Sequence, residues 1–232
     1  MPPIRGALFI EGKGEYHAAP RLMRRLWQHL GLQPFVDWQI ALQNTNFKDD
    51  KYLASQIDSI FGLRNGRYQL LVVMFDSDEK KNGACMCPKT KGPSTANILR
   101  AANLPIPSAV VLPYKEYEHF FVACLPLWAG RQVIDPMTQQ PLCTFVDDTS
   151  NALNMLNGRD GKGPIDEYIA AGEGYRETTH QLALTQMLDF THLQRPEIDP
   201  LVPAFGTLCR ASHFLAQQLV NPAPAAVYPP AA

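Results

Sequence analysis

The chain has 232 residues, 46% of them hydrophobic, so it is long enough to bury a substantial core in one large domain or in one domain with an appendage. Its 21 basic and 22 acidic residues leave a formal net charge of -1, which excludes a global basic field as the means of binding nucleic acid or an anionic membrane. The first residues lack a basic region followed by a long apolar core, and no stretch approaches ~18 uninterrupted apolar residues. We therefore expect a cytoplasmic protein with no membrane span.

Strands and helices alternate through the first 130 residues. Apolar runs predict strands at residues 3–10, 35–42, 68–75 and 108–113. Apolar residues at helical spacing predict helices at residues 17–31, 50–64, 94–104 and 115–130. Strands that are almost wholly apolar and flanked by helices predict an α/β fold, with a mostly parallel sheet covered on both faces.

The pattern loosens after this core of residues 1–130. Residues 131–220 predict a loop-rich and helical extension packed on the core, because turn-forming residues dominate its first half and two helical stretches follow, near 176–190 and 200–219. The tail at 221–232 is rich in proline and alanine; its prolines cannot continue a helix, and the tail offers little to bury. We expect this tail to be disordered or extended.

Acidic residues follow three of the predicted strands. Glu11 follows the first strand, Asp76 and Asp78 follow the third, and Glu116 and Glu118 come after the fourth. Ligands of open α/β sheets bind outside the carboxyl ends of the strands, so these acidic residues are expected to converge on one edge. Converging carboxylates repel each other unless a cation lies among them, and oxygen ligands favour a hard divalent cation. The pattern predicts a site for Mg²⁺ or Mn²⁺.

The spacing of these residues supports a shared site. Residues two apart in an extended segment point the same way, so Asp76 and Asp78 can direct their oxygens at one ion. Glu11 and Glu15 are four apart and would share a face if a helix began at the intervening glycine turn. An aspartate pair at a strand end is also typical of a helix cap or a solvated loop.

Glu116 and Glu118 would point to different sides of a helix, so only one of them is expected to face the cleft. Glu118 is the first choice and Glu116 the second. His17, His119 and His180 lie near these motifs, but surface or core histidines explain them better than ligands do.

Five cysteines, an odd number, indicate reduced thiols rather than a disulfide framework. Cys85 and Cys87 are separated by one residue, whereas zinc sites usually have two or more residues between paired cysteines and two further ligands. Ordinary thiols are favoured over a zinc site.

Two other enzyme classes fit poorly. An ATPase would need the motif G-x-x-x-x-G-K-[ST], which the sequence lacks. Phosphatases of the haloacid type also place Asp-x-Asp after a strand, but normally after the first strand of the sheet. In this sequence the motif follows the third predicted strand.

The order of the acidic motifs resembles the Toprim domain, the metal-binding fold of topoisomerases, primases and the OLD family of nucleases. The segments "LFIEGKGE" and "VVMFDSDE" carry this resemblance, with Glu11 and Gly12 after the first strand and Asp76 and Asp78 after a later one. OLD nucleases tend to carry a further glutamate four residues after the first, and Glu15 matches it.

A narrower resemblance spans about residues 4–215. The segments "FIEGKGE", "FDSDE", "CMCP", "YKEYEHFF" and "YRETTHQLALTQMLDF" are similar to those of the bacterial domain-of-unknown-function family 4276. This chain departs from that family at Phe120, where tryptophan is usual, at Gly14, where threonine is usual, and at Arg176, where lysine is more frequent. Proteins of this group are often associated with an ATPase and suspected of roles in anti-phage defence.

The resemblance implies a nuclease that holds two metal ions. Carboxylates would hold the ions, with Glu11 also a candidate general base, and Lys13 or Arg176 would contact the scissile phosphate or the leaving oxygen. It further implies a nucleic-acid substrate, DNA in preference to RNA, and a separate ATPase partner. The alternative is a non-catalytic Toprim-like subunit that binds an ATPase or nucleic acid.

Overall fold

The computed structural model describes residues 3–46, 49–77, 87–113, 116–157, 161–170 and 174–230. Asp78 and Cys85 therefore lie outside the described residues.

A parallel sheet forms the centre of the protein. In the described part of the chain it has five strands in the order β2-β1-β3-β4-β8, and every neighbouring pair is parallel. Its strands are β1 (Ile4–Ile10), β2 (Val36–Gln43), β3 (Leu70–Met74), β4 (Ser108–Val111) and β8 (Val227–Tyr228). The predicted α/β class with a mostly parallel sheet is confirmed.

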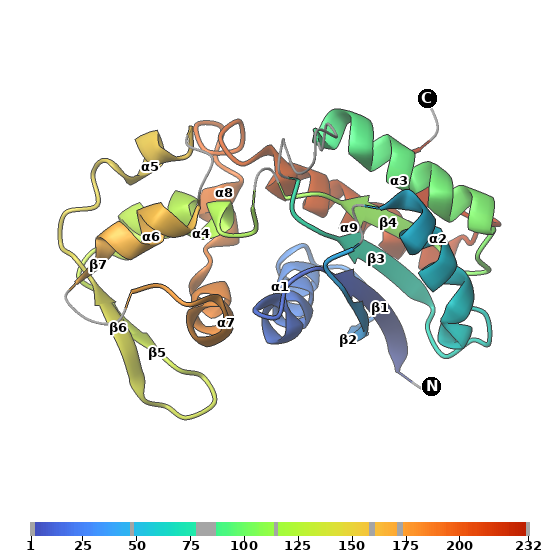
Figure 1. Ribbon diagram of the computed structural model, residues 1–232, viewed down its shortest axis with the longest axis horizontal. Coiled ribbons are helices and arrows are strands. Elements are labelled where there is room, and N and C mark those ends of the chain that lie inside the picture. Colours follow the sequence, from blue (N-terminus) through green and yellow to red (C-terminus); the bar gives the residue numbers. More distant parts are fainter. Residues whose placement is uncertain are drawn as a thin grey trace.

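Helices cover both faces of this sheet (Figure 1). The covering helices are α1 (Glu15–His29), α2 (Asp50–Ser59), α3 (Pro88–Ala102) and α9 (Pro203–Val220). Alternate side chains of each strand point to opposite faces, so Leu8 and Ile10 join the core under α1 and α9, whereas Ala7 and Phe9 join the core under α2 and α3. Burial on both faces explains why the strands are almost wholly apolar.

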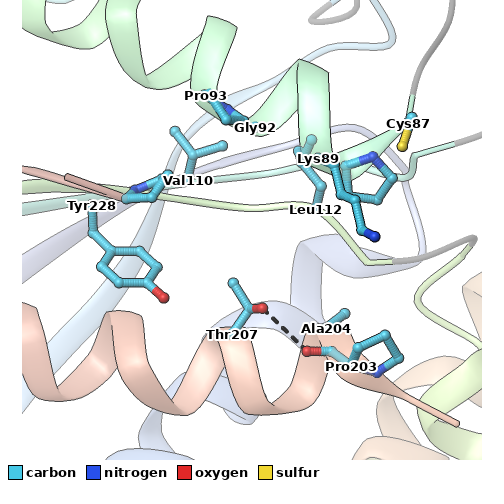
Figure 2. Close-up of a pocket in the computed structure, with 12 residues that line it drawn as sticks. Cys87, Lys89, Gly92, Pro93, Val110, Leu112, Pro203, Ala204, Thr207 and Tyr228 are labelled. Atoms are coloured by element: carbon cyan, nitrogen blue, oxygen red, sulfur yellow. Dashed lines mark hydrogen bonds between the residues drawn. The ribbon is translucent and has the colours of Figure 1, made fainter. Parts of the chain in front are cut away.

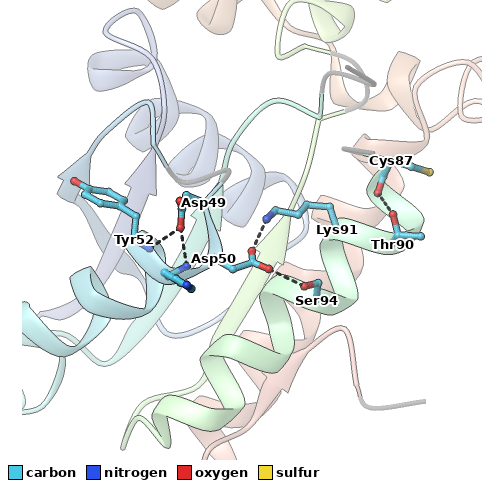
Figure 3. Close-up of polar contacts among 8 residues, drawn as sticks. Asp49, Asp50, Tyr52, Cys87, Thr90, Lys91 and Ser94 are labelled. Carbon is cyan, nitrogen blue, oxygen red and sulfur yellow. Dashed lines mark hydrogen bonds and ion pairs between the residues drawn. The ribbon is translucent and has the colours of Figure 1, made fainter. Parts of the chain in front are cut away.

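Polar contacts connect α2 to α3 (Figure 3). The carboxylate of Asp49 caps α2 by accepting hydrogen bonds from the backbone N–H groups of Lys51 and Tyr52, at 2.8 and 2.9 Å. Asp50 forms an ion pair with Lys91 of α3 and accepts a hydrogen bond from Ser94 at 3.2 Å. The two helices therefore keep a fixed alignment over their face of the sheet.

The middle of the chain forms a second group of elements beside the sheet (Figure 1). A three-stranded antiparallel sheet, counted over the described residues, has the order β5-β6-β7. The elements are the strands β5 (Gln132–Ile134), β6 (Pro141–Phe145) and β7 (Ile169–Ala170) and the helices α4 (His119–Cys124), α5 (Ala152–Met155), α6 (Lys162–Tyr168), α7 (Glu177–Met187) and α8 (Phe190–Leu193). Short 3₁₀ turns occur at Phe61–Leu63 and Leu125–Leu127.

Sequence reasoning missed this second sheet and overestimated the helix at 115–130. The turn residues between the short apolar runs of this segment predict loops, whereas in the structure the apolar runs pair as the strands β5, β6 and β7. The helix is shorter because it passes into the 3₁₀ turn that contains Pro126.

One continuous hydrophobic core joins the second group to the sheet. Helix α1 packs against α7 (Figure 1), and the guanidinium of Arg25 donates hydrogen bonds to the carbonyl oxygens of Thr185 and Leu188, the latter at 2.8 Å. Aromatic rings of Tyr117 and Phe121 fill the junction edge to face, with centroids 5.4 Å apart. The second group is therefore held against the same face of the sheet as α1.

Of the two states expected for the tail, disordered or extended, the described residues 221–230 show the extended one where they form a short strand. Val227 and Tyr228 form β8 against the outer edge of β4, where Val227 is buried in the core under α2 and α3. Arg100 donates a hydrogen bond to the carbonyl oxygen of Pro229, and Arg210 donates one to the Tyr228 hydroxyl at 3.2 Å. Proline excludes a helix here but permits a short edge strand, and that strand covers the otherwise open edge of β4.

None of the helices in the described residues combines the length and the apolar character that crossing a lipid bilayer requires.

Candidate functional site

Strand order creates a switch point between β1 and β3. From β1 the chain moves outward to β2, and it then returns to the other side of β1 to form β3. Ile10 at the end of β1 pairs with Met74 at the end of β3, so Glu11 and Asp76 leave the sheet at nearly the same level. Such a reversal opens a crevice at the carboxyl ends of the strands, which is where ligands of open α/β sheets bind.

Asp76 is the centre of a cluster of acidic side chains. Its carboxylate accepts a hydrogen bond from the backbone N–H of Tyr117 at 3.0 Å. Burial, followed by the negative charges of four glutamates, raises the pKa of Asp76 well above its ordinary range. In order of their effect the four are Glu15, Glu118, Glu11 and Glu116. The structure thus brings together every predicted acidic ligand that lies in its described part.

Glu15 lies in the first turn of α1, and its side chain folds back onto the preceding loop. Its carboxylate accepts hydrogen bonds from the backbone N–H groups of Glu11 at 3.1 Å and of Gly12 at 2.9 Å. Burial raises the pKa of Glu15 to about 7, aided by the charge of Glu11 and opposed by these hydrogen bonds. The helix begins at Glu15, so the expectation that Glu11 and Glu15 share one helix face is wrong. They meet through the loop instead.

Glu116 and Glu118 precede α4, which begins at His119, so neither has the helical position that the sequence predicted. The negative charges of both glutamates raise the pKa of Asp76, contrary to the expectation that only one of them would face the cleft. Glu118 is buried and accepts a hydrogen bond from the hydroxyl of Tyr175 at 2.9 Å. Glu116 accepts one from the backbone N–H of Gly161 at 3.0 Å. Burial raises the pKa of Glu118 to about 7, although a nearby lysine opposes the shift.

That lysine is Lys162 of α6, a residue that sequence reasoning did not select. It forms an ion pair with Glu177, and its pKa is raised because that contact and the charges of Glu118 and Glu116 outweigh the effect of burial. Its signal in the sequence is weak, because it consists only of a lysine between two glycines in a turn-rich segment. The fold alone places it beside glutamates more than 40 residues earlier.

The two cations that the sequence did select lie at the surface. Lys13 is exposed in the loop between Glu11 and Glu15. Arg176 is exposed at the start of α7, where its backbone N–H donates a hydrogen bond to His180 at 3.0 Å. The strongest cationic effect on Glu118 comes from Lys162.

Gly14, at the start of α1, lies against α7. A Cβ atom at this position would lie 2.2 Å from the side-chain oxygen of Gln181 and 2.9 Å from Cβ of Glu177, both on α7. A threonine at position 14 would therefore require the Gln181 side chain to move. Gln181 therefore provides the polar side chain that Gly14 lacks. Its amide nitrogen also lies 3.5 Å from the carboxylate of Glu118.

The histidines and cysteines add little to this site. His17 is exposed, His119 is buried at the start of α4, and His180 hydrogen-bonds the backbone of Arg176. Cys87 directly precedes α3. Across the described ranges no group of three or more His, Cys, Asp or Glu side chains has the arrangement of an assembled metal centre.

The chemistry of the acidic cluster nevertheless fits a hard divalent cation. Its donors are carboxylate oxygens, whose mutual repulsion and burial a cation would relieve. In addition, the side-chain oxygen of Gln181 is buried and accepts no hydrogen bond from any described residue. Glu11, Glu15, Asp76, Glu116 and Glu118 are the described residues suited to hold Mg²⁺ or Mn²⁺.

Comparison of this chain with models of known families, with curated proteins and with solved structures finds no match in any of the three.

Proposed function

We propose that this protein is a Mg²⁺- or Mn²⁺-dependent nuclease with a Toprim-like site. The observation that carries the proposal is the meeting of Asp76 with four glutamates at the switch point of a parallel sheet. Phosphodiester hydrolysis needs charge stabilisation on both the attacking and the leaving oxygen, and carboxylate-bound cations provide it.

The residues divide into ligands and their supports. Glu11, Asp76 and Asp78, together with Glu15, Glu116 and Glu118, would hold the cations, and Glu11 is also the candidate general base that would accept a proton from the attacking water. Bound cations polarise the phosphate and lower the pKa of water. Tyr175 and Gln181 orient Glu118 through hydrogen bonds.

Contact with the substrate phosphate is assigned to exposed cations at the border of the cluster. Lys13 lies between two of the cluster glutamates in sequence, and Arg176 follows Tyr175, whose hydroxyl binds Glu118. A nearly neutral chain needs such a local contact, because its net charge of -1 gives no general attraction for nucleic acid.

The family resemblance extends the proposal to a role in anti-phage defence, with DNA as substrate in preference to RNA and with a separate ATPase as partner. Co-expression with an ATPase, if one is encoded beside the gene, should give a complex that survives affinity purification. An ATPase that neither co-purifies with the chain nor stimulates cleavage would contradict this part.

Metal binding is the first test. We expect isothermal calorimetry to detect Mn²⁺ binding to the wild-type chain and no binding to Asp76→Asn, which keeps an acceptor for the N–H of Tyr117 but removes the central charge. The same variant should melt at a higher temperature without metal, because it relieves repulsion among buried carboxylates. Asp58→Asn, at an exposed carboxylate paired with Arg64, is the matched control and should bind like the wild type. Equal Mn²⁺ affinity in wild type and Asp76→Asn would contradict the site.

Cleavage is the second test. Linear and circular DNA and single-stranded RNA would be incubated with Mn²⁺, and Glu11→Gln or Asp76→Asn should lower the rate by more than ~100-fold. An unchanged cleavage rate in either variant would contradict the assignment of that residue to the catalytic site.

A non-catalytic subunit is the second candidate, and the position of Lys162 favours it. This lysine already supplies positive charge to Glu116 and Glu118 from within the chain. If the wild type binds neither Mn²⁺ nor nucleic acid alone yet still binds the ATPase, the binding-subunit function replaces the nuclease.

A further inference from the structure

A separate cavity lies between α3 and α9, beside β4 (Figure 2). Its volume is about 650 Å³, within the range of ~300–1,000 Å³ that small-molecule sites occupy. None of the acidic residues of the candidate metal site lines it.

The walls of the cavity are largely apolar. Val110 and Leu112 extend from β4 toward α3, and Pro203 and Ala204 lie across from them at the start of α9 (Figure 2). Pro93 of α3 also contributes. Such walls favour an apolar ligand body, because its transfer from water is worth about 25 cal/mol per Å².

Two residues in the wall are unfavourable for the helix that carries them. Gly92 and Pro93 lie inside α3, where glycine is less favourable than alanine and proline removes a backbone N–H donor. The missing donor is the one that would bond the carbonyl of Lys89. Local rules of this kind are typically broken at functional sites.

Packing does not require the glycine. Within 4 Å, a Cβ atom at Gly92 would meet only the Leu112 side chain among the described residues, at 4.0 Å, and the backbone there is not left-handed. A longer side chain would extend into the cavity. The glycine therefore keeps open a space that a larger helix-forming residue would fill.

Polar groups lie at opposite ends of the cavity in Figure 2. At one end Lys89 is exposed, and no described residue forms an ion pair with it. At the other end Tyr228 and Thr207 accept hydrogen bonds from Arg210, at 3.2 and 3.1 Å. Thr207 uses its own proton on the carbonyl of Pro203, whereas the proton of Tyr228 has no acceptor in the described residues. An unpaired cation at one end and a free O–H donor at the other complement a ligand with an anionic group.

We propose that this cavity binds a small amphiphilic anion. Its apolar body lies between α3 and α9, its carboxylate or sulfonate pairs with Lys89, and a polar atom at its far end accepts a hydrogen bond from Tyr228. The site is independent of the carboxylate cluster.

The test uses 1-anilinonaphthalene-8-sulfonate, which has an apolar body and one anionic group, titrated into the full chain and followed by fluorescence. We expect saturable binding at one site. Gly92→Phe should weaken binding by about tenfold or more by filling the cavity, and Lys89→Gln by about threefold or more. Gly92→Ala is the control, because it improves helix propensity and leaves the cavity open. Lys51→Gln is the control for Lys89→Gln.

Competition between the probe and unlabelled ligands tests whether the cavity recognises an anionic group. Decanoate should displace the probe at lower concentration than decanol, which shares its chain but lacks its charge. Equal displacement by the two would overturn the anionic part of the proposal. Unchanged probe affinity in Gly92→Phe, with a melting transition like that of the wild type, would overturn the site itself. A wild type that binds neither the probe nor decanoate would also overturn it and would leave the cavity to a side chain of a partner protein.

Discussion

At the residue scale, the two most informative groups are the carboxyls of Glu15 and Glu118. Burial raises the pKa of each to about 7, above the value of about 4.3 expected in an unfolded chain. Between these two pH values the folded protein binds more protons than the unfolded chain. The contribution of these groups to stability is therefore fully present below about pH 4.3 and is lost as pH rises to about 7.

This linkage predicts that the free energy of unfolding of the metal-free protein falls as pH rises from about 5 to about 7. Urea denaturation across that range measures it. In Glu118→Gln the fall should be shallower, because one of the carboxyls with a raised pKa is gone. Glu197→Gln, at an exposed position, should follow the wild type. Identical pH profiles for wild type and Glu118→Gln would contradict the burial argument.

Binding of Mn²⁺ should have the opposite pH dependence and become tighter as pH rises. Protons and Mn²⁺ compete for the same carboxylates, so affinity for Mn²⁺ should rise as pH approaches and passes about 7. Calorimetric titrations at pH 5.5 and 7.5 would compare the two affinities. Equal Mn²⁺ affinities at the two pH values would show that these two glutamates are not ligands of the metal.

At the element scale, the contact between α1 and α7 determines which residue can begin α1. Gly14 is the N-cap, where threonine is ordinarily about as favourable as glycine and much more favourable than alanine. Here the structure predicts that threonine is unfavourable, because a Cβ at Gly14 would overlap Gln181 and Glu177.

We expect Gly14→Thr to lower the free energy of unfolding by about 1–3 kcal/mol, the usual effect of overpacking. Truncation of the partner in Gly14→Thr with Gln181→Ala should recover part of that loss, whereas Gln181→Ala alone should not stabilise the protein. Urea denaturation of the four proteins completes the cycle. Strictly additive effects would show that these two positions are not in contact.

At the scale of the whole molecule, the short strand β8 near the end of the described residues completes the sheet. Val227 is 7% exposed in β8, whereas Val220, at the end of α9, is 68% exposed. Val227 lies in the core under α2 and α3, and its strand covers an edge that would otherwise be open to pairing with other chains.

Val227→Asp should therefore lower the free energy of unfolding by about 2–4 kcal/mol, because it buries a charge. It should also promote self-association through the uncovered edge of β4, which light scattering on a size-exclusion column would detect. Val220→Asp is the matched control and should change neither property. A fully stable, monomeric Val227→Asp would show that β8 contributes little to the fold.

Local sequence patterns determined the α/β class and part of the site. Apolar runs and helical periodicity predicted the four long strands of the sheet and its covering helices, because these signals depend on neighbouring residues. The same reasoning placed Glu11 and Asp76 at one edge, since parallel strands end on the same side.

Only the tertiary structure decided the surroundings of that site. Tyr175, Lys162 and Gln181 reach Glu118 across 44 to 63 residues of chain, and no local pattern encodes such contacts. The same holds for Gln181 against Gly14 and for the cavity that Gly92 keeps open. The physical reason is that periodicity reports which face of an element is buried, whereas the groups that meet across that face depend on how the elements pack.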